Sequence, residues 1–256
     1  MTWLDSIILG VLEGVTEFLP VSSTGHLVLA SQLLGIEPST FLSSFQIAIQ
    51  LGAIAAVVFL YWKSFLDFRF LTKLFVAFIP TGLVGFLVYP YVKGFLLGNS
   101  MVVVASLFVG GIVLILFELF YKEKPESVEG AKQITYGQAL LVGCFQSIAI
   151  IPGVSRSAAT IIGGLLVGMR RVAIVEFSFL LAVPTMVAAT GYDLLKSHDT
   201  FAFDQFGLLA LGFVTAFAVA LLSMRFLLAL VRRHTFIPFG IYRIVLAIAF
   251  FLIVLR

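Results

Sequence analysis

Long apolar stretches dominate the chain, and their lengths predict helices that cross a lipid bilayer. A membrane-spanning helix needs about 20 predominantly apolar residues. Stretches of this kind occupy residues 41–61, 71–91, 101–120, 174–195, 205–231 and 238–255. The alternation of polar and apolar positions that is typical of membrane-barrel strands is absent from the sequence. We therefore expect an all-α integral membrane protein with six transmembrane helices.

Two further apolar regions, residues 3–34 and 136–168, are interrupted near their middle by "LPVSSTG" and "IPGVSRS". Proline, glycine and hydroxyl residues end one helix and begin the next. Each region is too long for one span and too short for two spans with an external loop. Because non-helical backbone at membrane depth must be buried in protein or line a wet cavity, we predict two re-entrant helix–loop–helix hairpins.

The two interrupted regions resemble each other, which predicts an internal repeat. Shifting the whole chain so that Pro20 falls on Pro152 also pairs Ser23 with Ser155 and Phe45 with Phe177. Three predicted spans follow each hairpin, and an odd number of crossings reverses the side from which the second half starts. We therefore expect two inverted-topology repeats, residues 1–120 and 135–256, within a single membrane domain 1–256, as in many transporters.

Composition agrees with a membrane protein and excludes a nucleic-acid partner. Only 11% of the residues are charged, whereas soluble domains carry about 25%. Basic residues in such a chain mark topology rather than nucleic-acid binding. The single cysteine, Cys144, lies in an apolar run, which excludes an intramolecular disulfide and predicts a buried, inert thiol.

The distribution of lysine and arginine predicts the orientation of the chain. On one side of the predicted topology lie Lys63, Arg69, Lys73, Lys122, Lys124, Lys132, Arg170, Arg171, Arg232 and Arg233. On the other side lie Lys93, Lys196 and Arg256. The richer side is assigned to the cytoplasm, which places both termini outside. Arg156, Arg225 and Arg243 fall inside or at the edge of apolar segments.

The first hairpin carries two acids, Glu13 and Glu17, four residues apart and therefore on one helical face. Two carboxylates in a low-dielectric interior repel each other unless a cation lies between them or one is protonated. Glu13 and Glu17 are therefore candidate ligands of a divalent metal. The alternative is a pair of side chains that reach an interface.

Hydroxyl residues and a histidine follow the acids, namely Ser22, Ser23, Thr24 and His26. Hydroxyl residues at this position are standard helix N-caps. Ser22, Ser23 and Thr24 could therefore serve only to cap the helix. His26 lies one turn beyond Ser22 and Ser23, so its ring can share a face with them.

The second hairpin carries Arg156 in the company of Ser155, Ser157 and Thr160. An arginine at membrane depth needs an anion. Glu13 or Glu17 could supply it through a structural salt bridge, or the anion could be bound from outside.

Together the two hairpins predict a site for a lipid-linked phosphate or diphosphate. The N-terminus of each second half-helix offers free N–H groups and partial positive charge, and an arginine fork with hydroxyl donors adds to this cradle. A serine or histidine could attack the phosphorus or activate water. A transporter or flippase of such a lipid would use the same anion site and is the alternative function.

Two motifs, "EGVTEFLPVSSTGHL" and "PGVSRSAATI", closely resemble the bacterial undecaprenyl-diphosphate phosphatase family, the BacA-type bacitracin-resistance proteins. The resemblance covers nearly the whole chain, including "FQIAIQLGAIAAV" and "EFSFLLAVP". The second motif departs from the family at Ala158, where glycine is usual.

The resemblance implies removal of the terminal phosphate of undecaprenyl diphosphate. The product would be the lipid carrier for peptidoglycan and other envelope polymers, and the activity would confer bacitracin resistance. It also implies a divalent cation, Mg2+ or Ca2+, a polyprenyl diphosphate substrate among membrane lipids, and a homodimer. The location would be the bacterial inner membrane, with the site open to the periplasm.

The family's essential residues would fall on Glu13, Glu17, Ser23, Thr24, His26 and Arg156, with Ser155 and Thr160 at secondary positions. From their chemistry, Arg156 would bind phosphate oxygens, and the two acids would hold metal or protons. Ser22, Thr24, Ser155, Ser157 and Thr160 would bind substrate. The nucleophile stays open: Ser23 with His26 as its base, or His26 itself with Glu17 as its proton partner.

Overall fold

The computed structural model describes residues 1–91, 99–123, 127–196 and 205–255, and over these ranges the chain is helical. The first half contains α1 (Trp3–Thr16), α2 (Ser23–Leu33), α3 (Thr40–Tyr61), α4 (Phe68–Tyr91) and α5 (Ser100–Phe120). The second half contains α6 (Tyr136–Ser147), α7 (Arg156–Leu166), α8 (Arg171–Lys196), α9 (Phe206–Val231) and α10 (Ile237–Phe250). Short 3-10 turns occupy Trp62–Leu66, Ala131–Gln133 and Ile148–Ile150, and a π turn, Phe251–Leu255, follows α10. The predicted all-α class is confirmed.

Five stretches are long and apolar enough to cross a membrane: Thr40–Leu66, Phe68–Val88, Ser100–Phe120, Arg171–Tyr192 and Phe206–Val231. They coincide with five of the six stretches that the sequence predicts as spans. The region predicted at 238–255 forms a shorter apolar helix, Ile237–Ile253.

Side-chain caps mark the starts of several helices, including α3 and α5. Ser39 accepts a hydrogen bond from the backbone N–H of Leu42 at the start of α3, and Asn99 accepts from Met101 at the start of α5. Such caps satisfy N–H groups that have no partner within the helix. They explain why α3 and α5 begin one residue before the predicted apolar stretches.

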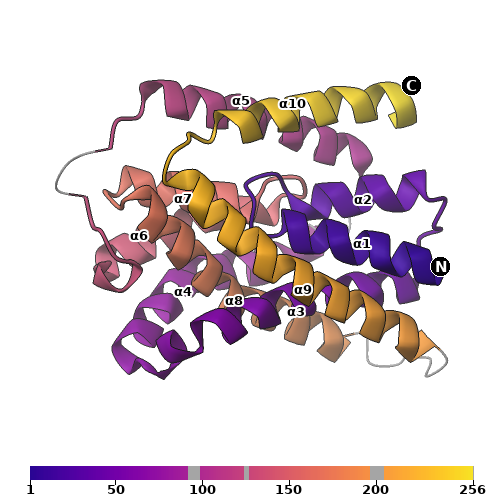
Figure 1. Ribbon diagram of the computed structural model, residues 1–256, viewed down its shortest axis with the longest axis horizontal. Coiled ribbons are helices and arrows are strands. Elements are labelled where there is room, and N and C mark those ends of the chain that lie inside the picture. The colour runs from indigo at the N-terminus through magenta and orange to yellow at the C-terminus, as the bar shows by residue number, and fades with distance from the viewer. Residues whose placement is uncertain (92–98, 124–126, 197–204, 256) are drawn as a thin grey trace.

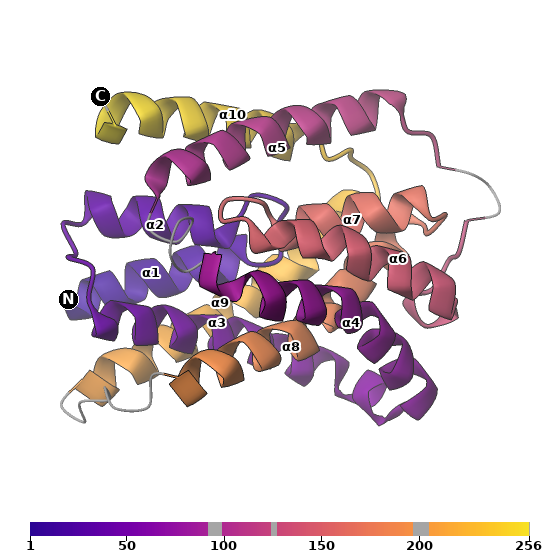
Figure 2. The ribbon, with the colours of Figure 1, turned by 180° about the vertical axis from the view of Figure 1, so that it is seen from behind.

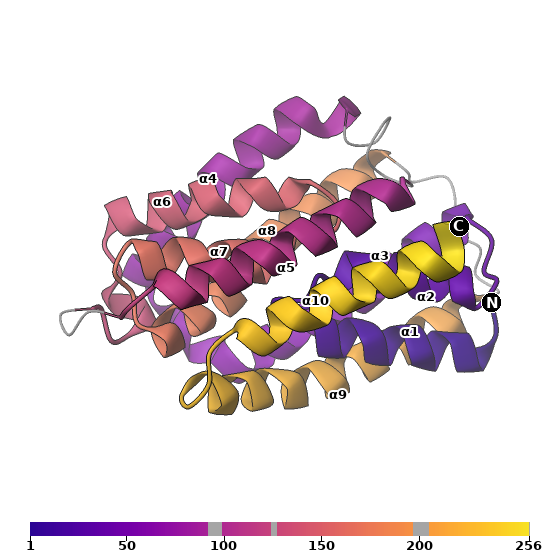
Figure 3. The ribbon, with the colours of Figure 1, turned by 90° about the horizontal axis from the view of Figure 1, so that it is seen from above.

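The two predicted hairpins are present as helix–turn–helix units. The α1–α2 and α6–α7 units approach from opposite ends of the molecule, and their turns lie near its middle (Figures 1 and 3). Each unit begins with a threonine capping box, Thr2 with Asp5 at α1 and Thr135 with Gln138 at α6. The shared capping box accounts for the similar start of the two units.

Helices from the two halves pack on one another: α1 and α3 lie along α9, α4 along α6, and α5 along α10 (Figure 2). Glycine permits the closest crossings. A Cβ at Gly52 would lie 2.4 Å from the Phe213 carbonyl oxygen, and one at Gly143 would lie 2.0 Å from that of Ala77. Small residues allow this backbone approach in membrane bundles, so the halves form one body.

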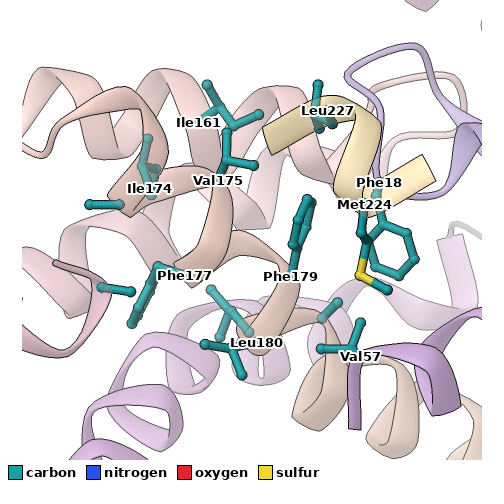
Figure 4. Packing of buried hydrophobic residues seen from close by; sticks show 14 of the residues in the cluster. Phe18, Val57, Ile161, Ile174, Val175, Phe177, Phe179, Leu180, Met224 and Leu227 are labelled. Carbon is teal, nitrogen blue, oxygen red and sulfur yellow. The ribbon is translucent and has the colours of Figure 1, made fainter. Parts of the chain in front are cut away.

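The main hydrophobic core surrounds α8 and reaches the first hairpin turn (Figure 4). Phe18, in that turn, packs edge-on against Phe179 of α8 with ring centroids 5.1 Å apart. Aromatic contacts of this kind add about 0.5–1.5 kcal/mol beyond area burial. The first hairpin turn is therefore packed against the hydrophobic core.

One prediction about the core is wrong. Cys144 is exposed, because the face of α6 that carries it, together with the exposed Leu140 and Leu141, points outward. An apolar residue on a lipid-facing surface gives the same sequence signal as a buried one.

Both termini lie at one end of the molecule (Figure 1). The segments 62–67, 127–135, 167–170 and 232–236 lie together at the opposite end. These segments, or the helix ends beside them, carry most of the basic residues that we assign to the cytoplasm. Lys93, Lys124 and Arg256 lie outside the described residues.

A buried ion pair stabilises that basic end. Arg171, at the start of α8, binds both carboxylate oxygens of Glu118 in α5, and the Glu118 side chain is fully buried. The Glu118 carboxylate also accepts a hydrogen bond from the backbone N–H of Phe236, 3.1 Å away. The pair therefore joins α5, α8 and the connection that leads into α10.

Replacing Arg171 with alanine should destabilise the protein by about 3–5 kcal/mol, because it leaves the Glu118 carboxylate buried and unpaired. Thermal unfolding in detergent measures the loss. Arg170→Ala is the matched control, since the Arg170–Glu129 pair is 40% and 68% exposed and such pairs contribute about 0–1 kcal/mol. Equal melting temperatures for both variants would contradict this role.

Candidate active site

A cavity of about 420 Å³ lies between the two hairpin turns and extends between α4 and α8. Its polar wall contains Glu17, Ser22, Ser23 and Thr24 from the first hairpin and Ser155 and Arg156 from the second. The remaining wall is mostly apolar and includes Phe78, Phe86, Ile150 and Met186. The structure thus brings six of the predicted site residues to one cavity.

Glu17, which ends α1, connects the two hairpins. Its Oε2 accepts a hydrogen bond from Ser23 Oγ at 2.6 Å, and its Oε1 accepts one from Arg156 Nη2 at 2.8 Å. The Arg156 and Glu17 side chains are only 11% and 5% exposed. The salt bridge considered from the sequence is therefore present, and Glu17 is its acid.

Arg156 retains a donor beyond that salt bridge. Its Nη1 donates to the backbone carbonyl of Ser178 at 2.9 Å. Its Nε is buried and has no hydrogen-bond partner among the described residues. A buried donor without a partner costs about 1–3 kcal/mol, so this N–H lacks an acceptor that the described residues do not supply.

Ser22 adopts a strained backbone conformation at the start of α2. Its φ is 72°, the only positive φ of a non-glycine residue in the described ranges. Residues in such regions cost about 1–3 kcal/mol and concentrate at functional sites. The Ser22 hydroxyl caps α2 by accepting from Gly25 N at 3.4 Å, which agrees with the capping alternative.

The N-termini of α2 and α7 both face the cavity, because Ser23 and Thr24 on one and Ser155 and Arg156 on the other line it. Ser155 caps α7 by accepting from Ala158 N at 3.1 Å. The first turn of a helix offers N–H groups without intrahelical partners and a partial positive charge. Two such ends at one cavity favour a polyanion.

His26 is buried but does not line the cavity. Its Nδ1 lies 2.8 Å from the Ser22 carbonyl oxygen, and its Nε2 lies 2.7 Å from the Tyr242 hydroxyl. A carbonyl only accepts, so Nδ1 carries the proton and Nε2 accepts from tyrosine, a tautomer inferred from these partners. Both ring nitrogens are engaged, and neither bonds to Ser23.

Glu13 lies one turn before Glu17 and is completely buried. Neither of its carboxylate oxygens has a hydrogen-bond partner among the residues that the structure describes. Glu13 does not line the cavity, whereas Glu17 does. A buried carboxylate without a donor requires a proton or a cation nearby.

Ser157 and Thr160 are not brought to the cavity. Ser157 Oγ donates to the Phe18 carbonyl at 2.7 Å, which ties α7 to the first hairpin turn. Thr160 Oγ1 lies 2.7 Å from Ser178 Oγ and 3.0 Å from the Arg156 carbonyl oxygen. The Ser157 hydroxyl thus joins the two hairpins and the Thr160 hydroxyl joins α7 to α8, so both hydroxyls are engaged in contacts within the protein.

Sequence reasoning missed several residues that complete the site. Ser178 supports Arg156 through its carbonyl, and Tyr242 holds His26. Gln50 and Thr81 line the cavity from α3 and α4. The sequence did mark Ser178 and Gln50 as polar residues within the apolar stretches "EFSFLLAVP" and "FQIAIQLG". A polar residue in such a stretch indicates a buried helix face, but it does not show which cavity that face lines.

The fold and the site define a helical membrane protein with a partly polar cavity between two hairpin turns. The chain belongs to the family described as "Bacitracin resistance protein BacA", which matches residues 6–249. This match confirms the resemblance found in the motifs.

Curated relatives cover nearly the whole chain. The undecaprenyl-diphosphatase of Sulfurihydrogenibium sp. (strain YO3AOP1) is 50% identical over 252 residues, which are 98% of this chain and 99% of that protein. The undecaprenyl-diphosphatase of Persephonella marina is 52% identical over 253 residues, with the same two shares. That of Aquifex aeolicus is 48% identical over 256 residues, 98% of this chain and 100% of its own length.

Proposed function

We propose that this chain hydrolyses undecaprenyl diphosphate to undecaprenyl phosphate and inorganic phosphate. Its relatives over nearly their full length are undecaprenyl-diphosphatases. The observation that carries the proposal is the Glu17 carboxylate, bonded at once to the Ser23 hydroxyl and to Arg156. The product is reused as the lipid carrier for peptidoglycan and envelope polymers, and the activity gives bacitracin resistance.

In the first chemical step, Ser23 Oγ attacks the terminal phosphorus. The Ser23 proton passes to Glu17 Oε2, 2.6 Å away. A bond forms between Oγ and phosphorus, and the bond from that phosphorus to the bridging oxygen breaks. Undecaprenyl phosphate leaves with the electron pair of that bond. A hydroxyl activated by an adjacent base is the standard form of such a nucleophile.

In the second step, water hydrolyses the phosphoserine. The water oxygen bonds to phosphorus, and the bond from phosphorus to Ser23 Oγ breaks. Oγ recovers its proton from Glu17, and both protons of the water leave on the inorganic phosphate. Arg156 stabilises charge on the non-bridging oxygens in both steps, because its Nε–H has no other partner among the described residues. His26 serves as a positioning residue, since its nitrogens already bind Ser22 and Tyr242.

The apolar part of the cavity accommodates the start of the hydrocarbon chain. Phe78 and Phe86 of α4 and Met186 of α8 form this wall. Ligand sites combine such apolar walls with a few placed polar groups. A substrate with a charged head and a prenyl tail fits a cavity that combines the charged and hydroxyl groups of the two turns with this apolar wall.

A divalent cation, Mg2+ or Ca2+, fits the two acids of the first hairpin. The orphaned Glu13 carboxylate is the observation that favours it. No group of three or more acid, histidine or cysteine side chains suited to a metal occurs in the described ranges, but Mg2+ is commonly held by one or two carboxylates plus substrate phosphates. Glu13 and Glu17 would hold the ion, which would neutralise diphosphate charge.

Glu13→Gln should lower phosphate release at least about tenfold, because loss of metal support typically costs about 10–100-fold. It should also remove most of the inhibition by a chelator, measured on purified protein with added Mg2+ or Ca2+. Glu176→Gln is the control, since Glu176 is a partly buried glutamate in a helix and, like the completely buried Glu13, does not line the cavity. Full chelator sensitivity in Glu13→Gln would contradict this metal site.

We also infer that the two halves are inverted repeats in the membrane. The support is the approach of the hairpins from opposite ends (Figure 1) and the reciprocal packing of α1 on α9 and α6 on α4. By this inference the hairpins are re-entrant and α10 is the sixth span. The basic end faces the cytoplasm of the bacterial inner membrane, both termini lie outside, and the site opens to the periplasm. The homodimer stays a prediction.

Phosphate release from undecaprenyl diphosphate by the purified protein in detergent tests the proposed activity. Detergent micelles have no sides, so a flippase alone would bind the lipid without releasing phosphate. We expect phosphate and undecaprenyl phosphate in equal amounts. Retained lipid binding without phosphate release would overturn the proposal in favour of a transporter.

A further inference from the structure

Arg243, in α10, is a buried arginine that the reaction described above does not use. It is 1% exposed, and no carboxylate pairs with it in the described part of the chain. Its guanidinium instead donates to four backbone carbonyl groups. These are Leu107 at 3.4 Å, Pro20 at 3.3 Å, Ser106 at 3.1 Å and Gly153 at 3.1 Å.

The four carbonyls come from three separate segments. Pro20 lies in the first hairpin turn, Gly153 in the second, and Leu107 and Ser106 in α5. A buried, unpaired guanidinium is costly, and a planar fork of five N–H donors is the side chain best able to bind several acceptors at once. Arg243 is therefore the point at which both catalytic turns are fixed to the same helix pair.

The backbone around Arg243 is shaped to receive it. A Cβ at Gly110 would lie 2.2 Å from Arg243 Nη2, so only glycine leaves room for the guanidinium there. Gly153 has φ +88°, a conformation that favours glycine. A Cβ at Gly153 would lie 2.7 Å from the Val103 carbonyl oxygen, so this turn is pressed against α5.

Arg243 reaches the second turn from the side away from the active-site cavity. It lines a separate, largely apolar cavity of about 470 Å³, together with Ile151 and Ala158. Val154 lies between the two cavities and lines both. Arg243 itself does not line the cavity of Ser23 and Arg156, so any effect on the reaction passes through the turns.

We propose that Arg243, seated against Gly110, is a positioning residue of the phosphatase reaction. By binding the Pro20 and Gly153 carbonyls behind the turns, it fixes the turn that separates Glu17 from Ser23 and the turn that precedes Arg156. The adjacent Tyr242 bonds to His26 from the same helix. The proposal rests on the phosphatase activity and adds a residue that sets the distance between nucleophile and arginine.

The test compares Arg243→Lys, Arg243→Gln and Gly110→Ala with the unaltered protein in detergent. Gly110→Ala keeps the Arg243 guanidinium but displaces it from its position against Gly110. Because misplacement by about 1 Å can cost 10²-fold in rate, we expect kcat to fall at least about tenfold in all three variants. The KM for undecaprenyl diphosphate should stay within about threefold, since the groups that bind the lipid are retained.

Arg243→Lys should be as impaired as Arg243→Gln, because a compact ammonium cannot span four carbonyls. A normal kcat in Arg243→Lys would contradict the requirement for a planar guanidinium. Gly137→Ala is the glycine control, since a Cβ there meets nothing within 4 Å. Thermal unfolding is measured on each variant, and a kcat loss matched by loss of folded protein would overturn the positioning role.

The outcomes separate this inference from the proposed function. Phosphate release by the unaltered protein, with normal kcat in folded Arg243→Lys and Gly110→Ala, would overturn the inference alone. An unaltered protein that releases no phosphate would overturn the function itself.

Discussion

Replacement of Ser23 by alanine should reduce phosphate release by at least about 10³-fold, because the account makes its oxygen the atom that bonds to phosphorus. Ser23 lines the cavity, and its hydroxyl donates to Glu17 at 2.6 Å. Binding of undecaprenyl diphosphate should persist, since Arg156 and both helix N-termini remain. Single-turnover phosphate release and equilibrium lipid binding, measured on the same preparation, separate the two effects.

Ser31→Ala is the matched control for this experiment. Ser31 lies in the same helix, α2, is also buried, and has a hydroxyl without a partner among the described residues. It does not line the active-site cavity, so its loss should leave the turnover rate unchanged. Substantial phosphate release by Ser23→Ala would exclude Ser23 as nucleophile and return the role to His26 or to water.

Arg156→Lys should lower kcat/KM by at least about 10²-fold, although the charge is kept. The arginine donates to the Ser178 carbonyl and to Glu17 at the same time and still holds a free Nε–H. A lysine ammonium is a compact point charge and cannot reproduce a planar fork. Removal of one preorganised donor at an oxyanion costs about 10²–10³-fold in comparable sites.

Arg225→Lys provides the control, because Arg225 is an exposed arginine in α9. Steady-state kinetics with undecaprenyl diphosphate measures both variants. Near-normal turnover in Arg156→Lys would contradict the assigned role of the guanidinium. Loss in both variants alike would point to a general effect of the substitution on folding.

The sequence predicted the hairpins and their meeting point because local signals define them. A proline, a glycine and hydroxyl residues end one half-helix and cap the next, and such signals act over a few residues. Buried charges in an apolar chain then marked Glu13, Glu17 and Arg156 as partners. Glu17 does pair with Arg156 across the hairpins.

The sequence could not decide where side chains point within a hairpin. Ser155 and Ser157 are two residues apart, yet only Ser155 lines the cavity while Ser157 bonds to Phe18. His26 shares a helix with Ser23, but its ring turns toward Tyr242 of α10. That choice depends on a helix more than two hundred residues away in the chain, which no local pattern reports.

The sequence also could not distinguish apolar helix faces that point outward from those that are buried in the protein. Cys144 gave the signal of a buried residue and is exposed, because lipid and protein interior are both apolar solvents. Arg243 gave the opposite signal, a charge inside an apolar span. Its partners are carbonyl groups from distant segments, and carbonyl groups are present at every residue and so leave no trace in the sequence.

The most direct test of the central claim is to trap and map the phosphorylated protein during turnover. Undecaprenyl diphosphate labelled in its terminal phosphate is mixed with enzyme and quenched within milliseconds, in parallel in acid, which preserves phosphoserine, and in alkali, which preserves phosphohistidine. We expect label on Ser23 in the acid quench and none in Ser23→Ala. Label on His26, or turnover without any protein-bound phosphate, would contradict it.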